Sequence, residues 1–232
     1  MKFEAALKIL QTITCHDNSI SRKECKYLFC ELHKPKYLGQ HKDTGHVCIG
    51  CGLDESIGFV ERFLSESFDL TTKNDSNINY LFTNYILLLY LTVEKFQTIF
   101  KFIGITYEYV EEKWPVLIEI RKWANFIKHP KGFMFTHHPN FKFENERINR
   151  KNKTRQFVDK EFVNKFYFRE DELKLKQTML EVANKDNITI ILPDVERIAI
   201  EFTKVCHEFC EKIKLNEHFK EILKSKVYID KD

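Results

Sequence analysis

The sequence predicts a mainly α-helical fold, a helical bundle with little or no β structure. Only seven glycines and five prolines occur in 232 residues, which favours long helices over many short strands joined by tight turns. Several long segments also repeat apolar residues at helical spacing. A hydrophobic content of 43%, with 21 phenylalanines, provides enough apolar surface for a packed core. The formal net charge of +3 does not by itself indicate nucleic-acid binding.

The N-terminal part is expected to hold two helices, a loop and a third helix. The hydroxyl of Ser19 or Ser21 can cap free backbone N–H groups at the start of the second helix, and Pro35 follows its end. The third helix begins at Asp54, where apolar residues return to helical spacing. These four segments cover residues 2–13, 19–33, 34–52 and 54–68, in that order.

A central buried helix is expected over residues 80–100, after a polar break over residues 71–79. The segment is apolar on most faces, so we expect it to lie between other helices. Asn84, Glu94 and Lys95 interrupt it, and it therefore lacks the roughly 20 apolar residues that a membrane span requires.

The next helical segment carries Pro115, which is tolerated in a first turn or else produces a kink. It should end at about His129, because Pro130 disfavours a helical conformation in the residue before it. A basic, irregular segment over residues 131–156 follows.

The C-terminal part is expected to end in one long amphipathic helix that begins after Pro193. Its apolar residues follow a period of 3.6. Before it, residues 157–168 fit either a short strand or a helix, residues 170–184 favour a helix, and residues 188–192 favour one short strand.

Two domains are expected: an N-terminal Cys/His-rich module over residues 1–53 and a helical domain over residues 54–232. The segment Met1–Lys8 alternates charged and apolar residues and lacks the apolar core of a secretory signal. We therefore expect a cytoplasmic protein that has no membrane-spanning segment.

Cysteines and histidines are concentrated near the N-terminus, where five of the seven cysteines and four of the nine histidines lie between Cys15 and Cys51. Cys48 and Cys51 form a Cys-x-x-Cys pattern with glycines that permit a tight turn. Cys30 and His33, one helical turn apart, would supply a second pair. Because Zn²⁺ accepts four sulfur and nitrogen ligands in a tetrahedral site, the cluster predicts structural zinc.

Other interpretations of the cysteines remain open. Cys25, His41 and His46 are reserve ligands, and the early cysteines could instead be small core residues, with the rest unliganded in a loop. Catalytic zinc is disfavoured, because no nearby carboxylate is placed beside an open metal position. Cys206 and Cys210 lie at one turn's spacing on the last helix, where core packing is expected.

Three polar residues, Arg121, Asn125 and His129, follow at i, i+4 and i+8 and would form one stripe on a helix. This stripe is expected to share its face with three apolar residues, Trp114, Leu117 and Ile118. A polar stripe on an apolar face must find partners, open onto a cleft or lie in an interface. The plain alternative is that His129 only caps the helix, where the macrodipole favours its cationic form.

This stripe resembles the motif of the HEPN superfamily, helical domains of prokaryotic toxin and defence systems. Asn125 and His129 match the spacing of the family's polar residue and histidine. The resemblance implies metal-independent RNA cleavage, in which the histidine serves acid/base chemistry, an arginine steadies the phosphate, and two protomers commonly share one site. Ala124 stands where the family's arginine is usual, and Arg121, one turn earlier, could replace it only in a rearranged site.

A run of basic residues follows the stripe and could contact RNA phosphates, although a solvated linker is the commoner explanation for such a run. Phenylalanines interleave with it as possible base-stacking surfaces. The predicted RNA contacts are Lys128, Lys131, Arg147, Arg150, Lys151, Lys153 and Arg155.

Two functions thus compete: an HEPN-like protein that binds or cleaves RNA, with Arg121, Asn125 and His129 as catalytic residues, and a non-catalytic, zinc-stabilised protein-interaction subunit. A zinc-dependent enzyme is a third, disfavoured reading. The expected partners are RNA and a protein partner or a second copy of the chain. Since the sequence holds neither a Gly-x-x-x-x-Gly-Lys-Ser/Thr loop nor a Gly-x-Gly-x-x-Gly motif, no nucleotide cofactor is expected.

Overall fold

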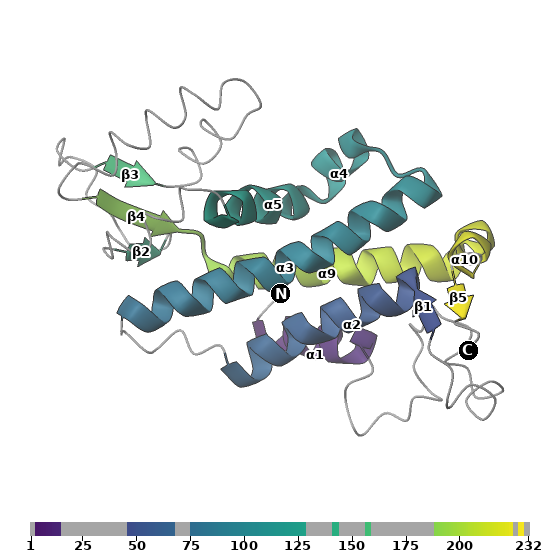
Figure 1. The fold of residues 1–232 in the computed structure, drawn as a ribbon, viewed down its shortest axis with the longest axis horizontal. Coiled ribbons are helices and arrows are strands. Elements are labelled where there is room, and N and C mark those ends of the chain that lie inside the picture. The colour runs from purple at the N-terminus through teal and green to yellow at the C-terminus, as the bar shows by residue number, and fades with distance from the viewer. Residues whose placement is uncertain are drawn as a thin grey trace. The chain divides into compact units, whose positions relative to one another are not determined.

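The computed structural model describes residues 3–14, 46–67, 75–128, 141–143, 156–158, 188–224 and 227–229. In this part of the chain the fold is mainly α, as predicted (Figure 1). The helices are α1 (Phe3–Thr14), α2 (Ile49–Arg62), α3 (Asp75–Ile103), α4 (Tyr107–Lys113), α5 (Pro115–Lys128), α9 (Val195–Leu215) and α10 (Glu217–Lys224), and a π-helical turn, η2 (Phe63–Ser67), follows α2. The strands are β1 (His46–Cys48), β2 (Phe141–Phe143), β3 (Gln156–Val158), β4 (Ile188–Leu192) and β5 (Val227–Ile229).

The chain divides into two compact units that alternate along the sequence. Unit 1 comprises residues 1–68, 88–118 and 199–232, and unit 2 comprises residues 69–87 and 119–198. Helices α3, α5 and α9 each contribute one part to either unit. The expected domain boundary between residues 53 and 54 falls inside α2.

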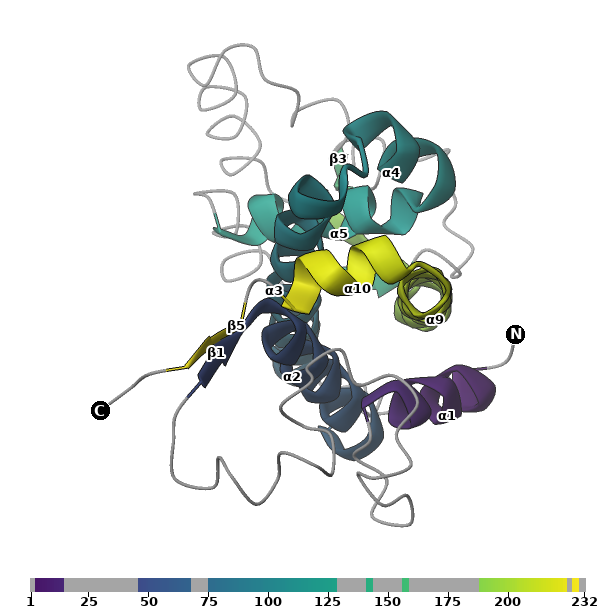
Figure 2. The ribbon, with the colours of Figure 1, turned by 90° about the vertical axis from the view of Figure 1, so that its right-hand side faces the viewer.

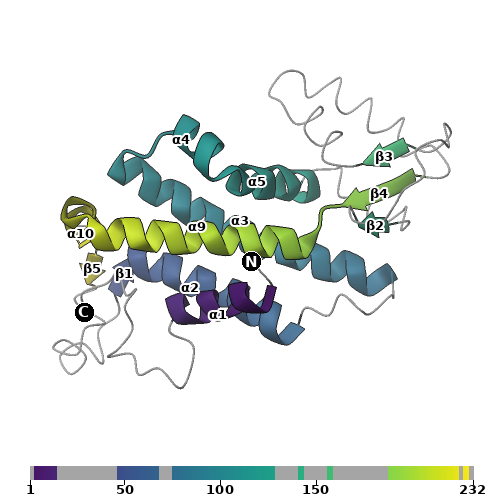
Figure 3. The ribbon, with the colours of Figure 1, turned by 180° about the vertical axis from the view of Figure 1, so that it is seen from behind.

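Unit 1 contains an aromatic core formed by residues of α3 and α9 and by Trp114, which lies between α4 and α5. The rings of Phe96 and Phe209 meet edge to face at 5.0 Å between centroids, and Phe100 stacks on Trp114 at 5.4 Å. Helix α1 lies along α2, where the Gln11 side-chain amide donates to the buried Glu61 carboxylate at 3.1 Å (Figures 1 and 3). Such rings bury large apolar areas in preferred edge-to-face and offset geometries, so this cluster dominates the packing of unit 1.

Local backbone chemistry fixes the ends of α3, α4 and α5. Gly104 follows α3 with a φ of 74°, and the N–H of Ile105 donates to the Phe100 carbonyl at 2.9 Å, which is the C-terminal capping pattern that favours glycine. Thr106 caps α4 by accepting from the Tyr109 N–H at 3.3 Å. Pro115 is the first residue of α5, which confirms the first-turn alternative and excludes the kink.

Unit 2 contains a parallel three-stranded sheet in the order β2-β4-β3 (Figure 3). Phe143 pairs in register with Leu192, whose side chain is fully buried. The Tyr85 hydroxyl of α3 donates to the Val195 carbonyl at 3.2 Å, where β4 gives way to α9. Trp123 meets Phe82 edge to face at 5.7 Å, so α3 and α5 share the core of this unit.

Four boundaries differ from the sequence prediction. The segment expected to be a loop over residues 34–52 holds β1 and the start of α2, where Gly50 and Leu53 are buried and packing offsets the poor helix propensity of glycine. Helix α3 begins at Asp75 inside the expected polar break, because short polar residues are favourable at a helix start.

The other two differences concern short strands. Strand β2 lies within the segment expected to be irregular, and β3 begins at the end of that segment. A three-residue strand carries no readable periodicity, and its pairing depends on distant residues. The strand over residues 188–192 and the long helix after Pro193 are confirmed. The helices expected over residues 19–33 and 170–184 lie outside the described residues. None of the described helices has the length and apolar character that crossing a membrane requires.

Candidate functional site

Helix α5 carries the residues of the predicted helix-end site, and burial divides it into an inner and an outer side. The inner side holds apolar residues that are nearly fully buried: Val116, Leu117, Ile120, Trp123, Ala124 and Phe126. On the outer side Arg121 and Lys128 are exposed, and Ile118, Lys122 and Asn125 are half-buried. The outer side of α5 is therefore polar and mostly cationic.

The predicted polar stripe lies on this outer side of α5. Asn125 follows Arg121 by four residues and precedes Lys128 by three, so the three residues occupy successive turns about 5.4 Å apart. Trp114 and Leu117, expected on the same face, are instead buried, and only Ile118 borders the stripe. Trp114 precedes the first residue of α5, and Leu117 lies about 40° around the helix from Arg121, on the side of buried Ala124. His129 lies outside the described residues.

One carboxylate of α5 is directed inward. Glu119, whose side chain is 8% exposed, accepts two hydrogen bonds from the Arg197 guanidinium, from Nη2 at 2.7 Å and from Nη1 at 3.1 Å. Such a two-point contact between a carboxylate and an arginine is both strong and geometrically specific. It neutralises the one acid of α5 and leaves the outer side with cations alone.

Arg197 is held in place by the start of α9. The Asp194 carboxylate accepts from the backbone N–H groups of Glu196 at 3.0 Å and Arg197 at 3.2 Å, and so caps the helix. Because β4 ends at Leu192, two residues before this cap, the sheet of unit 2 is connected to α5 through a short and well-defined path.

Ala124 occupies the position at which the resembled family usually carries its arginine. Its side chain is fully buried, in the same unit as buried Trp123 and Phe126. A long charged side chain at this position would have to be buried, which costs several kcal/mol unless the charge is paired. The described part of α5 thus offers Arg121, and not position 124, to a ligand in solution.

The basic residues after α5 lie largely outside the described part of the chain. This applies to Lys131, Arg147, Arg150, Lys151, Lys153 and Arg155. The structure does describe both ends of the segment that holds the last five: Phe143 ends β2 and Gln156 begins β3. Both strands pair with β4, so the two ends of this basic segment are fixed in the sheet of unit 2.

The described backbone places the Cys-x-x-Cys pattern across a strand-to-helix turn in unit 1. Cys48 is the last residue of β1 and Cys51 lies in the first turn of α2. Antiparallel pairing sets Cys48 opposite Val227 of β5 and His46 opposite Ile229 (Figure 2). Cys30 and His33 lie outside the described residues. Where side chains are described, no three His, Cys, Asp or Glu residues gather closely enough to hold a metal.

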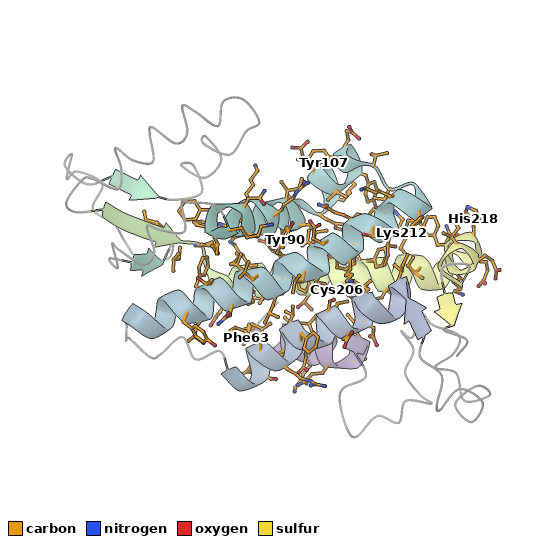
Figure 4. The ribbon with its side chains drawn as sticks, in the orientation of Figure 1. Phe63, Tyr90, Tyr107, Cys206, Lys212 and His218 are labelled. Atoms are coloured by element: carbon orange, nitrogen blue, oxygen red, sulfur yellow. The ribbon has the colours of Figure 1, made fainter. Side chains whose placement is uncertain are left out.

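Cys206 and Cys210 are core residues, as predicted. Both side chains are buried on α9, where Figure 4 labels Cys206. Burial raises the pKa of both thiols, and the mutual repulsion of the two thiolates raises that of Cys206 further. A protonated, buried thiol is neither a nucleophile nor a metal ligand.

Sequence reasoning missed the ion pair of Glu119 with Arg197 and the pairing of β1 with β5. A glutamate among the inward positions of α5 was the available signal for the first, since a buried carboxylate requires a partner. Comparisons of the chain with models of protein families, with curated proteins and with solved structures find no match.

Proposed function

We propose that this protein binds RNA in the cytoplasm through the outer side of α5 and does not cleave it. Arg121 is the principal phosphate contact, with Lys128 on the last turn and Asn125 between them. The basic residues between β2 and β3 extend the contact along the RNA. In this proposal the chain is an HEPN-like protein that retains a binding surface of the toxin and defence superfamily without its catalytic arginine.

The single observation that supports binding most strongly is the inward turn of Glu119. Because Arg197 neutralises that carboxylate, the exposed charges of α5 are all positive: Arg121 is exposed, and no acid lies beside it on the helix. Phosphate recognition needs positive charges at fixed spacing, and an α-helix provides that spacing.

Absence of cleavage is supported by Ala124. In the resembled family an arginine at this position steadies the phosphate during attack by the ribose 2′-hydroxyl, and here a buried methyl group stands in its place. Arg121 lies three residues earlier, and residues three apart on a helix point in directions that differ by about 60°. It can hold a phosphate without reaching the geometry that the transition state requires.

Binding is tested by fluorescence anisotropy with a labelled single-stranded RNA and no added divalent metal. Arg121→Glu should weaken binding about tenfold or more, because it replaces a charge-assisted contact by a repulsive one. Lys204→Glu makes the same kind of charge change at an exposed position of α9 and should leave affinity within twofold. Equal losses in both variants would indicate only a non-specific response to net charge.

Cleavage is tested on mixed cellular RNA, read on a denaturing gel, with the wild type and His129→Ala. The proposal predicts intact RNA with both proteins. Cleavage by the wild type that is lost in His129→Ala would overturn the non-cleaving part of the proposal and favour a ribonuclease.

We also propose a structural zinc site in which Cys48 and Cys51 supply two thiolates, with Cys30 and His33 as the remaining ligands. The support is the placement of the Cys-x-x-Cys pattern at the junction of β1 and α2, where two short elements meet within one compact unit. A zinc-stabilised module of this kind would serve protein interaction equally well, which is the second candidate function.

The zinc proposal is tested by metal analysis of the purified protein. Cys48→Ser and Cys51→Ser should each remove the bound zinc, whereas Cys210→Ala, which changes a buried core thiol, should retain it. A wild-type protein that purifies without metal, and takes up none on titration with Zn²⁺, contradicts the site.

A further inference from the structure

Helix α3 exposes large apolar side chains on one side of unit 1. Leu91 is 55% exposed and Phe102 is 41% exposed, although the inward residues of the same stretch are almost fully buried. The two residues are eleven positions apart, which is close to three full turns, so they share one face of the helix about 16.5 Å apart. The exposed polar residues Lys95 and Thr98 lie between them, so the two side chains form the apolar ends of one face of α3.

Opposite charges accompany this apolar pair on one flank of the same face. Glu94 and Lys101 are seven residues apart and therefore share a side of α3, with Glu94 half-buried and Lys101 exposed. About 10.5 Å of helix axis separates them, which is too far for the two side chains to pair with each other. Each charge therefore needs a partner from elsewhere or remains in water.

An antiparallel second copy of α3 satisfies both features at once. When the helix is placed against itself about a twofold axis near residues 96 and 97, Leu91 of each copy faces Phe102 of the other. In an antiparallel pair the same flank of each helix meets its own counterpart, so Glu94 lies beside Lys101 of the second copy and the reverse pair forms by symmetry. Lys95 lies on the opposite flank of the face, where the end of its side chain lies beside Gly52 of α2.

We propose that the outer face of α3, defined by Leu91, Glu94, Lys101 and Phe102, binds a second copy of this chain in an antiparallel, twofold-symmetric dimer. A self-complementary face is what a twofold interface requires, because the same patch must serve both subunits. The apolar ends supply the burial, and the two reciprocal ion pairs set the orientation and register. This proposal depends on α3 alone and does not rest on RNA binding.

The face is short, so the dimer is expected to be weak and reversible. Stable interfaces bury about 1,200 to 2,000 Å² in total, and a single pair of helices in contact over three turns buries less. The population of dimer should accordingly depend on protein concentration and, because the ion pairs lie near the surface, should fall with added salt.

Sedimentation velocity of the full chain over a concentration series tests the proposal. The wild type should shift from monomer to dimer as concentration rises, whereas Glu94→Lys and Lys101→Glu, each of which creates two repulsive pairs, should remain monomeric. The double variant carrying both reversals restores opposite charges across the axis and should dimerise again. Leu215→Asp, which alters an apolar residue that is 80% exposed at the end of α9, should dimerise like the wild type.

Rescue by the double charge reversal distinguishes this interface from misfolding or from another partner. Circular dichroism should be the same for all variants, since Lys101 is exposed and Glu94 is only half-buried. A wild type that stays monomeric throughout the series overturns the proposal. So does a double variant that is no better than the single ones, because the second copy would then contact some other surface.

Discussion

Glu119 on α5 and Arg197 on α9 form a two-point ion pair across 78 residues of sequence, with N–O distances of 2.7 and 3.1 Å. The pair joins two helices of unit 2 at the point where the sheet leads into α9. It also determines the charge on the outer side of α5, because Arg197 neutralises Glu119, the one acidic residue of that helix. The same ion pair therefore both stabilises the packing of α5 against α9 and leaves the outer side of α5 positively charged.

Removal of this contact should destabilise the protein measurably. Glu119→Gln leaves the Arg197 guanidinium without its counter-charge, and a cost of about 2 kcal/mol is expected, below the 3–5 kcal/mol of fully buried pairs because Arg197 is 29% exposed. Urea denaturation followed by circular dichroism measures the change. The matched control is Glu112→Gln, whose partner Lys113 is 54% exposed, and it should leave the urea midpoint almost unchanged. Equal costs for the two variants would contradict a special role for Glu119.

Tyr85→Phe should destabilise the protein by about 1 kcal/mol. The variant removes the hydroxyl that donates to the Val195 carbonyl at 3.2 Å and leaves a buried acceptor with one bond fewer. Tyr80, on the same helix, is 68% exposed, so Tyr80→Phe should have no effect on the urea midpoint. No loss of stability in Tyr85→Phe would mean that the carbonyl finds another donor.

Gly104→Ala should cost about 1 kcal/mol, because a Cβ is unfavourable at a φ of 74°. A Cβ there would meet no atom within 4 Å, so the cost would be conformational and not steric. Gly104→Asn, which tolerates this backbone region better, should recover part of the loss in thermal unfolding. A neutral Gly104→Ala variant contradicts the left-handed cap.

Alkaline pH should destabilise the protein and expose its core thiols. Burial raises the pKa of Tyr85, Cys206 and Cys210, so the folded state keeps these groups neutral while the unfolded chain ionises at ordinary values, 9.0 for a thiol. Their contribution to stability is thus complete below about pH 9 and is lost as the pH rises further. Urea midpoints measured between neutral pH and pH 10 test the direction of this change in stability. A midpoint that rises with pH would contradict the prediction.

The same thiols should be unreactive in the native protein. Thiol reagents attack the thiolate, and neither Cys206 nor Cys210 offers one in the folded state. Labelling followed by peptide mass spectrometry should modify both residues only in urea, with Cys206→Ala as the check on peptide assignment. Rapid native labelling of either residue would show that α9 opens locally.

The helices were predictable where one amphipathic stripe determines the structure. Residues Val195, Ile198, Phe202 and Phe209 of α9 are buried as their period requires. Apart from β4, the strands of the two sheets were not predictable from the sequence. Strands of three residues acquire their structure from partners far away in sequence, such as Ile190 and Ile229. In the candidate site, the position of Arg121 and Asn125 on one side of α5 was predictable from their spacing, whereas the burial of Ala124 and the partner of Glu119 depend on tertiary packing.

The most direct test of the central claim is the salt dependence of RNA affinity for the wild type and Arg121→Glu, with the recovered RNA examined on a denaturing gel. The account predicts that the wild type binds RNA and that the logarithm of its affinity falls linearly with the logarithm of salt concentration. The magnitude of this slope should be smaller by about 1 in the variant, and the RNA should be recovered intact. Identical affinities and slopes for the two proteins, or cleaved RNA, would contradict it.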